Sequence, residues 1–190
     1  MSKIIYRGIS ATILRSCRKT ISVQIKRNVV IVRAPEKMSD QEIISFLERK
    51  WSWISKHIIL VQQIQKQLEG QKPYTYDELK ALAATALQVI PEKVKHYAEL
   101  IGVDYGKITI RNQKTRWGSC SSKGNLNFNC LLMLLPEEVI DSVVVHELCH
   151  RKHMNHSQQF YAEIDRVFPH YKKCHDWLNQ NGGLYLSRLP

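Results

Sequence analysis

The sequence lacks any hydrophobic run long enough to cross a membrane, because no stretch approaches the roughly 20 apolar residues that a spanning helix needs. Its opening residues, 1–7, lead into polar and basic sequence rather than into the apolar region of a secretory signal. The five cysteines are well separated and form no C-x-x-C pair, which argues against a disulfide framework. We therefore expect a cytoplasmic protein that does not associate with membranes.

Acidic residues are also scarce, with 17 Asp and Glu against 28 Lys and Arg and a net charge of +11 at pH 7. The imbalance is concentrated in residues 1–70, which hold 13 basic and 5 acidic side chains. Basic surfaces attract nucleic acid or acidic partners, although they also simply keep proteins soluble. Nucleic acid is therefore a candidate partner of this part of the chain, through Arg15, Arg18, Lys19, Lys26 and Arg27.

The stretch 146–156 carries the clearest chemistry, since it begins with the pattern His146-Glu147-x-x-His150. Residues four apart on an α-helix lie one above the other, so His146 and His150 can bind one metal ion. Glu147 directly follows His146 on the helix and can reach a water on that metal without being a ligand itself. Catalytic zinc typically takes three protein ligands and leaves a fourth position for water.

A third ligand must therefore come from beyond this helix. His156 can serve only if the helix stops between His150 and His156, and Asn155 is a suitable stop because Asn tolerates the left-handed conformation. Glu163, in the next predicted helix, is the alternative donor. Residues 139–145 are mostly apolar, which predicts a buried helix, where a His–Glu–His cluster is costly unless a metal satisfies it.

Residues 1–70 are expected to form a domain that combines a small sheet with a long helix. Short alternating stretches within residues 3–34 predict strands, which we expect to pair antiparallel. Ser39-x-x-Glu42 is a capping box, in which two side chains satisfy free amides at the start of a helix. The helix that starts there is expected to run to Gly70.

Residues 71–190 are expected to form the second domain, unless the chain is one continuous domain. A second capping box at Thr75-x-x-Glu78 predicts a long helix that ends at Gly102. The whole chain is thus predicted to have an α+β fold. The remaining elements are expected in this order: strands over 107–111 and 125–130, the metal helix from Pro136, and two helices beyond His156.

Four stretches of this second part resemble, as a set, one known protein family. They are Arg111-x4-Arg116-Trp-Gly-Ser-Cys-Ser, Leu126-x2-Asn129-x2-Leu132, Val145-His-Glu-Leu-Cys-His150 and Asn155-His-Ser157-x2-Phe160. The family is that of the YgjP-like metallopeptidases, related to SprT-like and other zincin proteases. The resemblance covers most of the chain and implies a zincin-like metallopeptidase domain with its active-site helix beside a small antiparallel sheet. It also implies Glu147 as the catalytic residue and Zn²⁺ bound by His146, His150 and His156.

The sequence therefore predicts a zinc-dependent metallopeptidase that hydrolyses a peptide or protein substrate. Zinc would activate a water molecule, and Glu147 would act as the general base. The strand over 125–130 is either an edge along which an extended peptide could bind or an ordinary core strand. Candidate substrate-binding residues are Arg116, Trp117, Asn127 and Asn129. Candidates for stabilising the oxyanion are Arg116, His153, Tyr161 and His175.

Two alternatives stay open beside this prediction. The first is a nucleic-acid-associated, SprT-like protease in which the basic N-terminal part binds DNA. The second is a non-catalytic binding module stabilised by zinc. Glu147 speaks against the second alternative, since a purely structural zinc site has no use for a base beside a water position.

Overall fold

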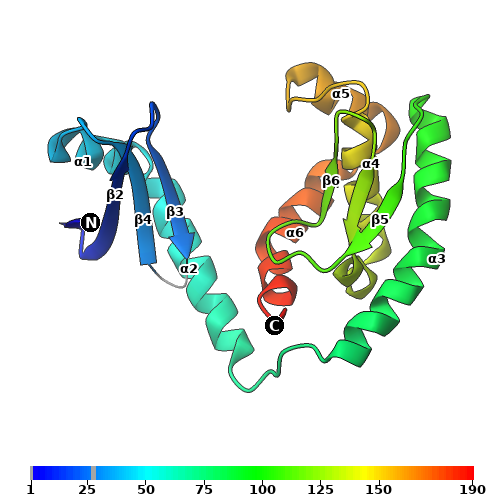
Figure 1. The fold of residues 1–190 in the computed structure, drawn as a ribbon, viewed down its shortest axis with the longest axis horizontal. Coiled ribbons are helices and arrows are strands. Elements are labelled where there is room, and N and C mark those ends of the chain that lie inside the picture. The colour runs from blue at the N-terminus through cyan, green and yellow to red at the C-terminus, as the bar shows by residue number, and fades with distance from the viewer. Residues whose placement is uncertain (1, 27–28) are drawn as a thin grey trace. The chain divides into compact units, whose positions relative to one another are not determined.

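The computed structural model describes residues 2–26 and 29–190. The contacts within the chain divide it into two compact units, Met1–Glu69 and Gly70–Pro190, each with its own apolar core. Figure 1 shows the elements of both units. Arg27, which was predicted as a nucleic-acid contact, lies outside the described residues. Within the described ranges, no helix is both long and apolar enough to span a membrane.

The first unit contains a four-stranded sheet in the order β1-β2-β4-β3. The strands are β1 (Ser2–Tyr6), β2 (Ile9–Ser16), β3 (Ser22–Lys26) and β4 (Val29–Pro35). Strands β2 and β4 are parallel, whereas the other two pairs are antiparallel, so the expectation of an all-antiparallel sheet was wrong. The parallel register places Ala11 beside Val30 and Ile13 beside Val32, which brings the buried side chains of both strands together in one core.

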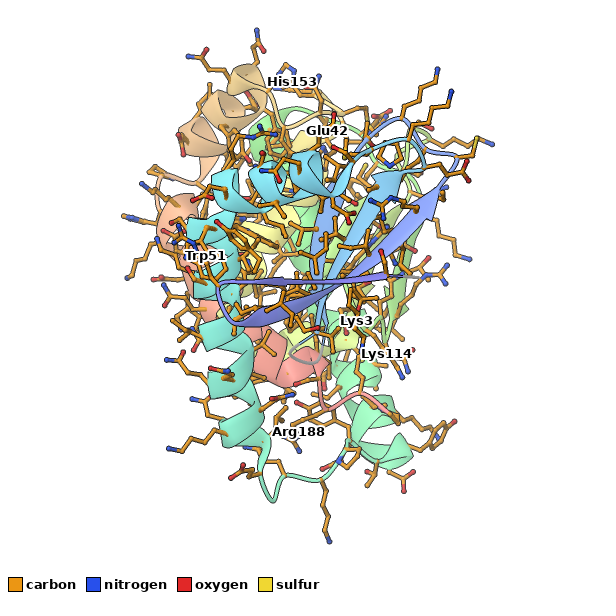
Figure 2. The ribbon with its side chains drawn as sticks, turned by 90° about the vertical axis from the view of Figure 1, so that its left-hand side faces the viewer. Lys3, Glu42, Trp51, Lys114, His153 and Arg188 are labelled. Carbon is orange, nitrogen blue, oxygen red and sulfur yellow. The ribbon has the colours of Figure 1, made fainter. Side chains whose placement is uncertain are left out.

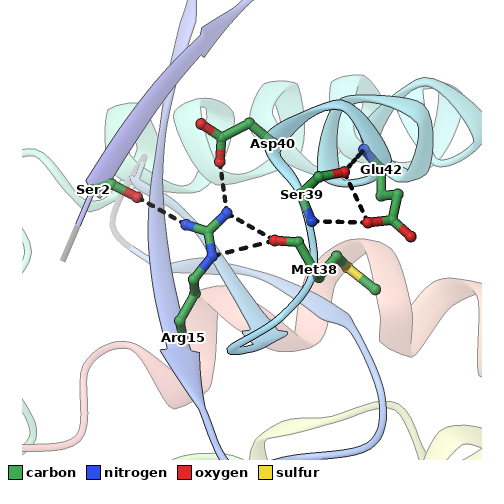
Figure 3. Close-up of polar contacts among 6 residues, drawn as sticks. All are labelled: Ser2, Arg15, Met38, Ser39, Asp40 and Glu42. Carbon is green, nitrogen blue, oxygen red and sulfur yellow. Dashed lines mark hydrogen bonds and ion pairs between the residues drawn. The ribbon is translucent and has the colours of Figure 1, made fainter.

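The predicted capping box of the first helix is confirmed, as Figure 3 shows. The Ser39 hydroxyl accepts the Glu42 amide, while the Glu42 carboxylate accepts both the Ser39 amide and its hydroxyl proton. Beside this box, Arg15 donates to the Asp40 carboxylate at 2.6 Å and to the Met38 carbonyl at 3.0 Å (Figure 3). Arg15 therefore ties β2 to the start of this helix, which leaves less of its charge for an external partner.

The single helix expected up to Gly70 is two helices, α1 (Asp40–Arg49) and α2 (Trp51–Leu68). They are separated at Lys50, whose backbone leaves the helical conformation at φ −98° and ψ 3°. Ile43, Leu47 and Ile54 are nonetheless all buried in the core formed with the sheet.

The second unit begins with the long helix α3 (Tyr76–Ile101), whose predicted ends are both confirmed. Thr75 and Glu78 form the capping box, and Gly102 ends the helix in the left-handed conformation at φ 76°. The later elements are β5 (Ile108–Arg111), β6 (Gly118–Cys120), β7 (Leu126–Asn129), the 3₁₀ helix η1 (Cys130–Leu134), α4 (Glu137–Cys149), α5 (Gln158–Val167) and α6 (Tyr171–Leu186).

The sheet of this unit has the order β5-β7-β6, with β5 parallel and β6 antiparallel to β7 (Figure 1). The sheet is thus mixed rather than antiparallel. Strand β7 is central, so of the two alternatives for this strand the structure supports the core strand, and β6 is an edge strand. Helix α4 packs against β6 and against α3, α5 and α6, which explains why it is buried along most of its length. The mixed α+β class itself is confirmed.

The C-terminal tail is docked within this unit. The Tyr74 amide donates to the Arg188 carbonyl at 3.0 Å, and the Arg188 side chain, labelled in Figure 2, donates to the Lys72 carbonyl at 3.1 Å. Helix α6 runs through Gly182, where an added Cβ would lie 2.9 Å from Nε1 of Trp117. The absence of a side chain at Gly182 therefore allows Trp117 to pack closely against α6.

Candidate active site

Helix α4 ends where the second histidine of the motif stands. His150 is its C-cap, and the amides of Arg151 and His153 close the last turn on the carbonyls of Leu148 and Cys149. The helix therefore stops before Asn155, which had been expected to end it. The N-cap of α5 is Ser157, whose hydroxyl accepts the Phe160 amide. The short connection between α4 and α5 is what brings His156 back toward the motif.

The three predicted histidines lie together. Nitrogen atoms of His146, His150 and His156 all lie within 4.8 Å of one another, and the Nε2 atoms of His146 and His156 are 3.2 Å apart. Nδ1 of His150 is 3.0 Å from the His153 carbonyl, which can only accept, so Nδ1 carries the proton and Nε2 offers a lone pair. Nδ1 of His146 is held by the Tyr171 hydroxyl at 2.7 Å.

This arrangement fits a zinc ion. In a tetrahedral site, two nitrogen ligands that each lie about 2.0–2.1 Å from the zinc are about 3.3 Å from each other. The Nε2 atoms of His146 and His156 have nearly this separation, 3.2 Å. Burial and the neighbouring histidines lower the pKa of His146 to about 3, so this imidazole stays neutral and able to bind a metal. Phe160 is fully buried, and its ring lies 4.7–5.1 Å from all three imidazoles, forming an apolar wall behind them.

Glu147 lies beside the histidines with only 6% of its surface exposed. Its carboxyl group rests against Gly118 at the start of β6, where an added Cβ would be 2.7 Å from Oε1. Burial raises the pKa of Glu147 to about 8, opposed by the amide of Cys120 and the charge of Arg116. The fold thus holds a carboxyl group with a high proton affinity next to the histidine cluster.

A cavity of about 280 Å³ opens beside His146 and Glu147. The predicted substrate residues Arg116 and Trp117 line it, together with Gly118. The remaining lining residues come from α4, α6 and the loop before β6: Thr115, Ser142, Val143, Tyr171, His175, Leu178 and Asn179. Of the four candidates for oxyanion stabilisation, the cavity includes Arg116 and His175.

Asn127 and Asn129 do not line this cavity, because their amides are used within the sheet and its loops. Asn127 accepts from Arg111 at 2.9 Å and donates to Ser119 at 3.2 Å. Asn129 is 1% exposed and donates to the carbonyls of Gln113 and Arg116 at 2.7 and 2.9 Å. Asn129 therefore shapes the loop that carries Arg116 rather than facing the cavity.

Helix α6 supplies Tyr171 and Asn179, to which the sequence analysis gave no role, beside His175, which was a candidate for stabilising the oxyanion. Tyr171, His175 and Asn179 are spaced four apart, so they share one face of the helix, and this spacing was the signal that could have revealed them. The rings of Tyr171 and His175 lie 5.4 Å apart. Nδ2 of Asn179 lies 3.1 Å from Nδ1 of His175, and an amide donor there leaves the proton of His175 on Nε2.

Glu163, the alternative third ligand, has other partners. Its carboxylate forms ion pairs with Lys152 at 2.8 Å and with Arg166 at 2.7 Å. Hydrogen bonds from these cations lower the pKa of Glu163 to about 2. Within the described residues, the group arranged to hold a metal consists of the three histidines.

A known family model matches most of this chain. Residues 19–81 and 79–181 match the family model described as the YgjP-like metallopeptidase domain. Two similar solved structures are the metallopeptidase zymogens of Pyrococcus abyssi abylysin and Methanocaldococcus jannaschii jannalysin, with sequence identities of 27% and 22%. These matches cover 47% and 48% of this chain and 91% and 94% of those chains, each with a TM-score of 0.44. Curated proteins gave no match.

Proposed function

Because the chain belongs to the YgjP-like metallopeptidase family, we propose that it is a zinc peptidase with Glu147 as its general base. The observation that carries the proposal is the cluster of three imidazoles, with one of them, His146, lining a cavity together with the buried carboxyl group of Glu147. The metal ligands would be His146, His150 and His156. An all-nitrogen set of three donors suits a catalytic zinc, which leaves one position open.

When bound, zinc would polarise the scissile carbonyl and lower the pKa of the attacking water. Glu147 would accept a proton from that water and deliver it to the amine that leaves. Its raised pKa suits both steps, because a group that titrates near neutral pH can take up and release a proton. Tyr171 and the His153 carbonyl would keep His146 and His150 in the orientation that binds the metal.

We assign the stabilisation of the substrate carbonyl oxygen to His175 as a proposal. Asn179 holds the ring in the tautomer that has Nε2–H as a donor, and both residues line the cavity with Glu147. His153 and Tyr161 are not part of that lining. Strand β6 lies at an edge of the sheet and begins at Gly118, beside Glu147. An extended peptide would bind along this edge.

Metal analysis of single variants tests the ligand set. We expect about one zinc per chain in the wild type and a large loss in His146→Ala, His150→Ala and His156→Ala. Glu163→Gln is the matched control and should keep its zinc, since its carboxylate is engaged by Lys152 and Arg166. Full zinc in His156→Ala together with loss in Glu163→Gln would show that the third ligand was assigned wrongly.

The excess of basic residues in residues 1–70 supports a second, separate proposal, that this part binds nucleic acid weakly while residues 71–190 carry catalysis. Arg15 contributes less to it, because it pairs with Asp40. Reversing Arg18 and Lys19 to Glu should weaken binding to duplex DNA, and wild-type affinity should fall steeply with added salt. A titration at low salt with no binding, or with equal binding by the variant, would remove this proposal.

A further inference from the structure

The chain around the cavity has a one-sided charge. From residue 105 to residue 136 there is no Asp or Glu, whereas five Lys and Arg occur in the same stretch. All five are exposed: Lys107, Arg111, Lys114, Arg116 and Lys123. This stretch contains the whole sheet of the second unit and the loop that forms one wall of the cavity. Of these five residues, Arg116 lines the cavity.

Arg116 brings that charge into the cavity itself. Arg116 lines the cavity together with Glu147. Glu147 is the one carboxyl group among the lining residues, all of which the structure describes, and it is 6% exposed. The other polar lining residues carry no negative charge: Thr115, Ser142, His146, Tyr171, His175 and Asn179.

Part of the cavity lining is apolar. Val143 from α4, Leu178 from α6 and the indole of Trp117 line the cavity, and Val143 is 6% exposed. Such a site accommodates a short aliphatic stem with a polar end. Glutamate has this form, and a guanidinium can hold its carboxylate with two parallel hydrogen bonds. Lysine has a similar stem, but its ammonium would face Arg116 with the same charge.

We propose that this cavity is a specificity site for an acidic side chain, best glutamate, next to the scissile bond, and that Arg116 selects it. The inference rests on the proposed peptidase function, since the cavity adjoins His146 and Glu147. Arg116 would act in substrate binding, whereas the chemistry stays with Glu147 and the histidines.

Two series of fluorogenic peptides test this, with Glu, Gln, Lys or Phe placed either before or after one cleaved bond. With zinc-loaded wild type, kcat/KM for Glu should exceed that for its isostere Gln by roughly 10-fold or more in one series. Arg116→Gln should reduce this ratio to about threefold or less, and Arg116→Glu should favour Lys over Glu. The preference should also weaken as salt is added.

Lys114→Glu is the matched control. Lys114, labelled in Figure 2, is exposed on the same loop but does not line the cavity, so this variant makes the same charge reversal as Arg116→Glu without changing the cavity lining. It should keep the wild-type preference for Glu. If Lys114→Glu loses the preference as fully as Arg116→Glu does, long-range charge rather than the cavity selects the substrate, and the inference is wrong.

The remaining outcomes separate the inference from the function on which it rests. Cleavage without preference for Glu over Gln, or with Phe strongly favoured over Glu, contradicts the inference and leaves the peptidase function intact. A zinc-loaded wild type that cleaves neither series contradicts the peptidase function as well. Binding of the Glu and Gln peptides to Glu147→Gln, followed by tryptophan fluorescence, gives a second readout, because Trp117 lies in the cavity wall. Equal affinities there would also contradict the inference.

Discussion

At the scale of single residues, the position of Glu147 depends on a neighbour that has no side chain. Gly118 lies so close that an added Cβ would be 2.7 Å from both Cγ and Oε1 of Glu147. Contacts this short do not occur between ordinary side chains, so one group must move. Glu147 is enclosed and has little room to shift, since it is 6% exposed.

Gly118→Ala should therefore displace the carboxylate while leaving the histidines in place. We expect kcat to fall at least about 10-fold, because small errors in the position of a catalytic group are costly. Zinc content should stay near the wild-type value. Gly106→Ala is the control, because its Cβ would come equally close to a side chain, that of Asn125, away from the site. Unchanged kcat in Gly118→Ala, or an equal loss in Gly106→Ala, would show that Gly118 does not position Glu147.

At the scale of elements, the segment between α4 and α5, which carries His156, is held in place by ion pairs as well as by helix caps. Glu163 on α5 pairs with Arg166 on the same helix and with Lys152 in the turn that follows α4. Hydrogen bonds from Arg166 and Lys152 lower the pKa of Glu163 from its ordinary value of 4.5 to about 2. The ionised carboxylate is therefore favoured by folding, and the ion pairs link α5 to the end of α4.

This gives a pH-dependent contribution to stability. A lowered folded-state pKa stabilises the protein above pH 4.5, and the contribution is lost as pH falls from 4.5 toward 2. Because Arg166 and Lys152 are 53% and 35% exposed, solvent screening reduces the contribution to about 1 kcal/mol. Denaturant unfolding of wild type and Glu163→Gln should differ by this amount at pH 7, and the difference should shrink below pH 4.5 and vanish below about pH 2. A constant difference across this range would contradict the ion-pair account, and Asp165→Asn on the exposed side of α5 serves as the control.

Element ends were predictable where the signal is local. Ser39 and Thr75 cap the helices that their capping boxes predicted, and Gly102 ends α3, because these patterns act within one helical turn. The break at Lys50 and the early end of α4 were missed. The Asn155 signal was overridden once Arg151 and His153 closed the last turn on α4 itself.

At the scale of the whole molecule, pairings between distant segments could not be read from the sequence. The alternation in residues 126–129 identifies a strand, but the same alternation fits an edge strand and a central one, and β7 is central. The candidate site likewise has some features that could be predicted from the sequence and others that could not. The pair of His146 and His150 followed from spacing, and His156 was added from an expected break in the helix and from the family resemblance. The cavity, and the contact between Tyr171 and His146, depend instead on how α6 packs on α4.

The central claim is that Glu147, as a base beside the three-histidine zinc site, makes this chain a peptidase rather than a zinc-stabilised binding module. Glu147→Gln tests it directly, since Gln keeps the shape of the side chain and removes its basicity. The measurement is zinc-dependent hydrolysis of a broad peptide library by wild type and variant, with zinc content matched by elemental analysis. We predict that the variant keeps its zinc and its fold, while kcat/KM falls by about 100-fold or more. Equal turnover at equal zinc content would contradict the account.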